Sequence, residues 1–446
     1  MKKYLFILGL VGTALFTACS SADDLTEEKP NEASAVDKAK EATLILEAGQ
    51  DSDVPIALGM LGSRRYAMTR LPLESTEFQI SGGNLSVYCL ATGIQVGAPN
   101  ISAIPASADD IVWNDPNKIA NWLVNQPAIV SYYNGTGASP ITGGSSSYSY
   151  IQFWKDGVVK ERYYPFGNWY SYDFFAYYPR VGDASTSYSD TGKSCFAKLT
   201  LDGKSDAIWA HASSTDVIDG VKAYSSKYIR LKKEVDEDGT PGPDYSEYQI
   251  VPEFEFQHLL SQFVFTIKPH AADATELSDK GFAVKGMKFT EIPTQLQLVV
   301  ASKESSHKSG DLENLETPVT GNIKLWTSGT DADPFSGGAI PVVPASYDPA
   351  DESTHTTVVG YAMVPPSKTI NETALINEHT VSLEMKQNSG DAVPNTVVSL
   401  TPPTGGFLPG KIYHIEIEIL NPTKIQAKAT LVGWEDVALP TVIQVD

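Results

Sequence analysis

The sequence has little of what catalytic, metal-binding and disulfide-stabilised proteins depend on. It has three cysteines and seven histidines in 446 residues, and no histidine stands at metal-ligand spacing from another. HExxH pairs, glycine-rich phosphate loops and GxSxG elbows are missing, and with them the common metalloprotease, nucleotide-binding and hydrolase signatures. We therefore expect no catalytic residues, no metal, no cofactor and no enzymatic activity.

Positive charge is also scarce. The chain has 33 Lys and Arg against 54 Asp and Glu, which gives a net charge of −21. Binding of nucleic acid relies on Lys and Arg contacts to phosphate, so this balance argues against a nucleic-acid partner. It is typical of a surface protein whose copies repel one another.

Long hydrophobic runs are absent except at the N-terminus. A mostly apolar stretch, 4–16, follows two lysines and is too short to span a bilayer, so residues 1–18 are interpreted as a signal peptide. It leads into Phe16-Thr17-Ala18-Cys19, which resembles a lipoprotein cleavage site with Phe16 in place of the usual leucine. This pattern predicts acylation of Cys19, and an ordinary secretory signal that contains a cysteine is the alternative.

Residues 19–40 are polar and charged, and they predict an acidic, flexible tether between the lipid and the folded part. The pair Asp23-Asp24 is similar to the signal that sends lipoproteins to the outer face of the outer membrane. Because no later stretch is apolar enough to span a bilayer, the lipid is the only membrane attachment that the sequence offers.

Two cysteines remain after lipidation, Cys89 and Cys195, and both lie in strand-like segments. The sequence cannot place them within bridging distance of each other. Two buried free thiols are the favoured interpretation, and one disulfide is the alternative.

Helical periodicity is scarce, and strand patterns fill most of the chain. Apolar and polar side chains alternate over 413–419, which predicts a half-buried antiparallel strand with one wet face. Asp156-Gly157 lies inside the strand-like stretch 151–164 and predicts a β-hairpin. The best helix candidate is 116–125, behind a proline at the first turn. Many short strands with frequent Gly and Pro turns predict an all-β protein built from β-sandwiches.

The order of these segments suggests two domains. A short apolar run with β-branched residues predicts a first strand at 42–47, followed by a loop over 48–77. A long strand-rich stretch, 253–267, places the join near residue 252. We therefore expect an N-terminal sandwich over 41–252 and a C-terminal sandwich over 253–446.

Three segments, taken in this order, resemble the fimbrillin-like (type V pilin) family of Gram-negative gut and oral anaerobes. Segment 168–179 is an aromatic strand that ends in Ala-Tyr-Tyr-Pro, and segment 256–265 reads Phe-Gln-His-Leu-Leu-Ser-Gln-Phe-Val-Phe. Segment 408–436 opens with Leu-Pro-Gly-Lys-Ile-Tyr and closes with Val-Gly-Trp-Glu-Asp. The likeness covers most of the chain after the tether, and the combination of motifs carries it.

The resemblance implies two transthyretin-like β-sandwich domains in tandem and a lipid-anchored precursor on the cell surface. It also implies trimming by an Arg- or Lys-specific protease and assembly with other fimbrial subunits by β-strand complementation. In that family the first strand is cut away, and a strand of the neighbouring subunit fills the groove. A vacated strand leaves unpaired backbone groups and an apolar slot, and an incoming strand satisfies both.

In this sequence the removable strand would be 42–47. The basic residues that follow it are Arg64, Arg65 and Arg70. Arg70 is the favoured cut, because the next clear strand starts only near Phe78, and three solvated surface arginines are the alternative.

A second class of function rests on the aromatic segment Tyr148 to Tyr178, which holds 14 aromatics in 31 residues. Aromatic faces can stack on sugar rings, which makes Trp154, Trp169, Tyr170 and Tyr172 candidate ligand-binding residues. Sandwich core is the favoured interpretation of such density. The leading hypothesis is thus a structural or adhesive fimbrial subunit, at the tip or as an accessory, with a host protein or glycan as ligand. The alternative is a glycan-binding surface lipoprotein.

The lipid anchor can be tested directly. Cys19→Ala removes the only thiol at the cleavage site, so we expect the protein to leave the membrane fraction or to lose surface display. Fractionation of outer membranes measures this, with Ser20→Ala as the neighbouring control. Unchanged fractionation of Cys19→Ala contradicts the prediction.

Overall fold

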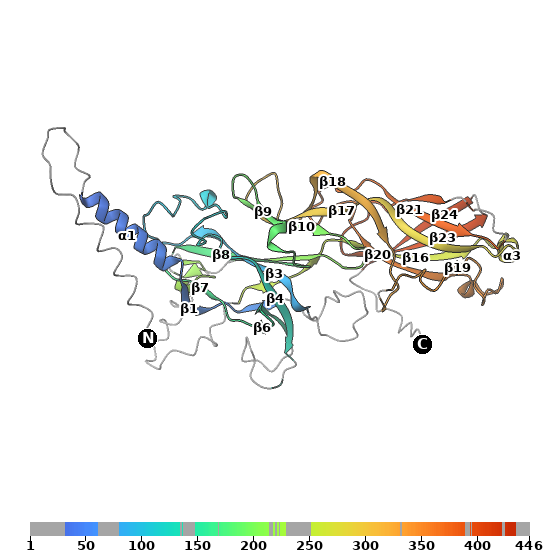
Figure 1. Cartoon of the computed structure of the whole chain (residues 1–446), viewed down its shortest axis with the longest axis horizontal. Coiled ribbons are helices and arrows are strands. Elements are labelled where there is room, and N and C mark those ends of the chain that lie inside the picture. Colours follow the sequence, from blue (N-terminus) through green and yellow to red (C-terminus); the bar gives the residue numbers. More distant parts are fainter. Residues whose placement is uncertain are drawn as a thin grey trace. The chain divides into compact units, whose positions relative to one another are not determined.

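The computed structural model describes residues 32–60, 80–133, 136, 148–167, 169–213, 217–218, 221–222, 224–228, 251–330, 332–388, 393, 395–421 and 424–433. The chain divides into one unit of residues 1–45 and one compact unit of residues 46–446. Strands dominate the second unit (Figure 1), which confirms the all-β expectation.

The first described element is a helix, α1 (Glu32–Ala48). The strand predicted at 42–47 is therefore wrong, and residues 32–40 of the predicted tether are helical. Ala, Lys and Glu dominate this stretch, and no Gly or Pro interrupts it before Gly49. These residue types have high helix propensity, which outweighs the three-residue apolar run at 44–46.

The N-terminal half forms a nine-stranded sheet, drawn in blue to green in Figure 1. Along its hydrogen-bonded path lie β14 (Glu253–Phe254), β2 (Leu58–Met60), β5 (Tyr148–Lys155), β4 (Leu123–Tyr133), β3 (Ile80–Ile94), β8 (Tyr170–Tyr178), β11 (Ile208–Ala212) and β15 (Gln257–His258). The short β6 (Val158–Val159) pairs with β5. A separate small pair joins β1 (Asp51–Pro55) to β7 (Tyr163–Pro165).

Two further sheets complete the described strands of the larger unit, apart from the two-residue pair β12 (Val217–Ile218) and β13 (Val221–Lys222). A seven-stranded sheet contains β22 (Thr396–Leu400), β21 (His379–Lys386), β17 (Ala283–Ser302), β10 (Ser194–Thr200) and β9 (Thr186–Tyr188), with β18 (Leu312–Lys324) and β19 (Ile340–Pro341) paired to β17. A four-stranded sheet contains β20 (Thr357–Val364), β16 (Ser261–Pro269), β23 (Lys411–Asn421) and β24 (Lys424–Gly433). A short helix, α3 (Ala274–Asp279), follows β16.

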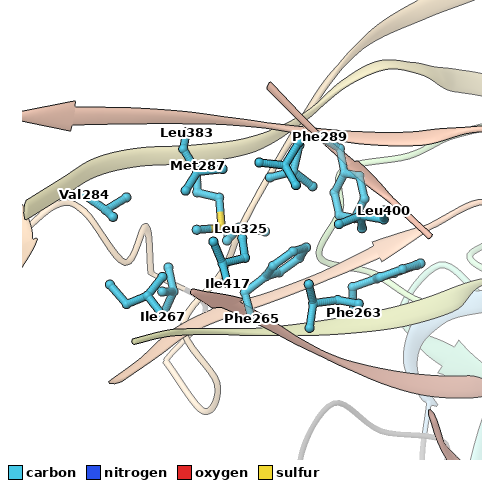
Figure 2. Packing of buried hydrophobic residues seen from close by; sticks show 14 of the residues in the cluster. Phe263, Phe265, Ile267, Val284, Met287, Phe289, Leu325, Leu383, Leu400 and Ile417 are labelled. Carbon is cyan, nitrogen blue, oxygen red and sulfur yellow. The ribbon is translucent and has the colours of Figure 1, made fainter. Parts of the chain in front are cut away.

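The C-terminal core lies between the four-stranded sheet and the first half of β17 with its neighbours. Figure 2 shows Phe263, Phe265 and Ile267 of β16 facing side chains of the other sheet, including Met287 and Phe289. The ring of Phe263 lies within 5.4 Å of the rings of Phe289, Phe407 and Tyr413, centre to centre. Burial of both inner faces makes this half a β-sandwich, as expected.

One strand belongs to both halves of the molecule. The first part of β17 pairs with β21, from Ala283 opposite Lys386 to Thr290 opposite Thr380. Its last part pairs with β10, from Gln295 opposite Thr200 to Ser302 opposite Ser194. A division near residue 252 therefore leaves β17 paired with β10 across it, and the ranges 41–252 and 253–446 stay a prediction.

Local patterns predicted several strands correctly. In β23 the side chains of Tyr413, Ile415, Ile417 and Ile419 are at most 1% exposed, while His414 between them is exposed. The strand pairs antiparallel with β24 and parallel with β16, so its sheet is mixed.

The predicted hairpin is present, because Asp156 and Gly157 both adopt positive φ (52° and 83°) between β5 and β6.

The helix predicted at 116–125 is wrong. The carboxylate of Asp115 accepts the N–H groups of Asn117, Ile119 and Ala120, which holds a turn in front of β4.

Cys89 of β3 and Cys195 of β10 are both buried free thiols. Burial raises the pKa of each thiol well above its usual value. Both therefore act as small core residues with little thiolate character.

The C-terminal core yields a stability test. Phe263→Ala empties the centre of the aromatic cluster and should lower the free energy of unfolding by about 3–5 kcal/mol. Val358→Ala is the control, because Val358 lies in the same sheet with 59% of its surface exposed and should cost less than about 1 kcal/mol. Denaturant titration measures both, and equal losses contradict the assignment of the core.

Candidate functional site

The N-terminal segment, defined here as residues 48–60, lies directly before the stretch that contains the three arginines. Its first strand, β1, pairs antiparallel with β7, with Asp51 opposite Pro165 and Pro55 opposite Tyr163. Two further backbone hydrogen bonds extend the pairing: Phe166 N–H donates to Gln50 O, and Ile56 N–H donates to Arg162 O, each at 2.8 Å. The segment is thus tied to the chain around β7.

The second strand, β2, has a neighbour on each side. It pairs antiparallel with β5, where Leu58 lies opposite Ile151. It pairs parallel with β14, where Phe254 lies opposite Met60, and the N–H of Gly59 donates to Pro252 O at 2.9 Å. β2 is therefore an interior strand of the sheet, although it comes from the start of the chain.

The apolar side chains of the segment are buried. Ala48, Val54 and Leu58 are each 1% exposed, and Ile56 is 8% exposed. Burial of a Val, Leu or Ile side chain is worth about 1.5–3 kcal/mol. The fit is close at Gly59, where an added Cβ would lie 3.1 Å from Cγ1 of Val251.

β2 also completes the closure of the sheet. β14 and β15 lie at opposite ends of the hydrogen-bonded path, yet only Glu255 and Phe256 separate them in the chain. The two ends of the sheet must therefore lie close together, and the rings of Phe254 and Phe256, both buried, are 5.9 Å apart there. Removal of β2 would open this ring between β5 and β14.

One buried hydroxyl group next to the segment lacks a hydrogen-bond partner among the described residues: it belongs to Tyr164 of β7, the strand that β1 flanks. Burial raises the pKa of Tyr164 well above its usual value. An unsatisfied buried hydroxyl costs about 1–3 kcal/mol, so the packing beside β1 is not fully satisfied.

The predicted processing and lipidation residues lie outside the described residues. Cys19 precedes them, and Arg64, Arg65 and Arg70 fall within residues 61–79, which link β2 to β3 in sequence. The structure thus bears on the segment before the arginines. Of the predicted loop 48–77, residues 51–60 mostly form β1 and β2.

The aromatic candidates for ligand binding are mostly core residues. Trp169, Tyr170 and Tyr172 are 5%, 3% and 2% exposed, so their ring faces cannot bind a ligand at the surface. The hydroxyl of Tyr172 also donates to Ile119 O at 2.9 Å. Trp154 is half-buried and lies against Gly83, where an added Cβ would approach its Cδ1 to 2.8 Å.

β1 and β2 lie within the predicted loop 48–77, although the sequence contains a signal for strands there. Val54, Ile56, Leu58 and Met60 are apolar at every second position, which is the period of a half-buried strand.

Among the described residues, no helix is both long and apolar enough to cross a bilayer. Within the same residues, His, Cys, Asp and Glu form no group that could hold a metal ion.

Solved structures similar to this chain include fimbrial proteins and candidate cell-adhesion proteins. A candidate cell adhesion protein from Bacteroides uniformis is 14% identical, with 86% of this chain and 100% of that chain covered and a TM-score of 0.40. A fimbrial protein from Bacteroides vulgatus is 13% identical, with 79% and 93% covered and a TM-score of 0.35. The tip fimbrial protein Mfa3 from Porphyromonas gingivalis is 11% identical, with 80% and 98% covered and a TM-score of 0.32.

No protein-family model and no curated protein matches the chain. The structural neighbours are of the kind that the sequence motifs resemble.

The anchoring of the segment can be measured. Leu58→Ala should lower the free energy of local opening by about 2–5 kcal/mol, because it leaves a cavity under β2. Hydrogen exchange of the Ile56 and Gly59 amides should accelerate accordingly. Leu46→Ala, at a side chain that is 69% exposed, is the control and should leave both rates unchanged. Equal rates in both variants contradict the anchoring role of Leu58.

Proposed function

We propose that the chain is a structural or adhesive subunit of surface fimbriae that matures by proteolysis and assembles by strand exchange. One observation carries the proposal: a buried strand at the start of the chain, β2, lies between two other strands and directly precedes the arginine-containing stretch. This arrangement makes the N-terminal segment separable by a single cut, because only non-covalent contacts would then hold it.

Loss of the segment would create a binding slot for a strand. One wall would be β5, where Ile151 would lose its backbone pairing with Leu58, and the other would be β14 at Glu253 and Phe254. The floor would be the apolar site that Leu58 leaves. Unpaired strand edges and an apolar floor are what a strand of a neighbouring subunit satisfies in β-augmentation.

The removable element in this proposal is β1 with β2, in place of the 42–47 stretch that lies in α1. Lipid on Cys19 would hold the precursor at the outer membrane until the cut, and the cut would release the mature subunit from its anchor. Other fimbrial subunits are the partners, and a host protein or glycan is the ligand of an adhesive subunit.

The alternative, a glycan-binding surface lipoprotein, has less support. It relied on the aromatic segment, and Trp169, Tyr170 and Tyr172 are buried in the sheet. A monomeric binding protein also has no need of an arginine-containing stretch directly after β2.

The proposed cut lies after Arg70, with Arg65 or Arg64 as the other candidates. Cutting there keeps every strand from β3 onward, since β3 begins at Ile80. N-terminal peptide mapping of surface material should find a mature chain that starts at Leu71. Replacement of all three arginines by alanine should leave a longer chain and few fimbriae. Replacement of all three by lysine separates an Arg-specific protease from one that also accepts lysine.

A wild-type surface protein that still starts at Cys19, with normal fimbriae, overturns the proposal. So does a chain cut with trypsin that retains residues 48–60 and stays monomeric on size-exclusion chromatography. Release of the segment followed by self-association supports strand exchange.

A further inference from the structure

Residues 201–206, in the loop between β10 and β11, reach from the N-terminal half of the chain onto the C-terminal sandwich. The N–H of Met363 in β20 donates to Gly203 O at 2.8 Å, and the indole N–H of Trp326 donates to Asp202 O at 3.0 Å. The ammonium of Lys204 lies 5.5 Å from the centre of the Trp326 ring. We refer to residues 201–206 as the clamp loop.

The clamp loop is shaped for this contact. The carboxylate of Asp202 accepts the N–H groups of Lys204 and Ser205 at 2.7 and 2.6 Å, which folds the loop into a tight turn. Gly203 adopts a φ of +73°, and a Cβ on it would lie 2.3 Å from Cγ2 of Ile323 and 2.9 Å from Lys324 O. Only glycine fits this position, because any side chain would enter the other sandwich.

The residues that the clamp loop contacts are fixed by burial and by backbone hydrogen bonds. Ile323 is 2% exposed and belongs to the C-terminal core. Trp326 exchanges two backbone hydrogen bonds with Tyr361 of β20, each at 2.8 Å. The clamp loop thus rests on the core and on a main strand of the second sandwich.

Two other connections cross the same junction. β17 pairs with β21 in its first part and with β10 in its last part. β15 continues into β16 through Leu259 and Leu260, which are 2% and 0% exposed. At the same place, Nδ1 of His258 is hydrogen-bonded to the carboxylate of Asp206, and each side chain is 9% exposed.

We infer that the clamp loop and the shared strand β17 join the two sandwiches into one body that unfolds in a single cooperative step. Tandem domains that are linked only by a flexible segment unfold separately, because neither loses contacts when the other opens. Here the opening of one sandwich breaks β17 pairing and uncovers Ile323 in the other. In a fimbrial subunit such a joint would pass tension from one sandwich to the next, and this consequence alone rests on the proposed function.

Scanning calorimetry of the purified chain without its signal peptide tests the inference. We expect one transition in the parent, with a van't Hoff enthalpy equal to the calorimetric enthalpy. Gly203→Ala should separate the transition into two, or lower the ratio of the van't Hoff enthalpy to the calorimetric enthalpy clearly below one. Gly97→Ala is the matched control, because Gly97 has a φ of +74° and a Cβ there would meet nothing closer than Nζ of Lys227 at 3.9 Å. It should keep a single transition.

Two transitions in the parent, or a single transition with an unchanged ratio in Gly203→Ala, overturn the inference. If Gly203→Ala does not fold, Trp326→Phe gives the same readout. This substitution removes the hydrogen bond to Asp202 O and keeps an aromatic ring at the position. An unchanged ratio in that variant also counts against the clamp. Failure of this test leaves the proposed cut and strand exchange untouched, since neither depends on the clamp loop.

Discussion

The N-terminal sheet depends on one constraint: each strand edge must find a hydrogen-bonding neighbour or remain open to another chain. The sheet meets this constraint by bringing its ends together, with β14 and β15 separated by two residues. β2 fills the remaining place between β5 and β14. The strand that completes the sheet is thus the one whose chain leads directly into the arginine-containing stretch, where the proposed cut would separate it from the rest of the sheet.

Sequence patterns predicted those structural features that depend on a few consecutive residues. The alternation in β23 and the Asp156-Gly157 turn were recognised correctly, because side-chain period and positive φ are properties of a few consecutive residues. The helix α1 is not predicted, because the short apolar run at 44–46 indicates a strand, whereas the Ala, Lys and Glu around it favour a helix.

The candidate site was harder to predict from sequence. β2 has three residues, and its partners lie at 150–151 and 253–254, so no local window contains the pairing. The shared strand β17 is a similar case, since its two sets of partners come from segments far apart in the chain. The aromatic segment misled for a related reason. Composition cannot tell which face of a strand is inward, and Tyr170 and Tyr172 turned out to be core.

The position of β2 also sets the order in which the sheet can form. It is synthesised before β5 and β14, but it can take its place between them only after both exist. Contacts between residues so distant in sequence form late, because closing a long loop costs entropy that earlier contacts must offset. The rest of the N-terminal sheet must therefore take shape without this strand. A segment that enters last contributes little to nucleation, so a chain that loses it after folding keeps every contact that guided its folding.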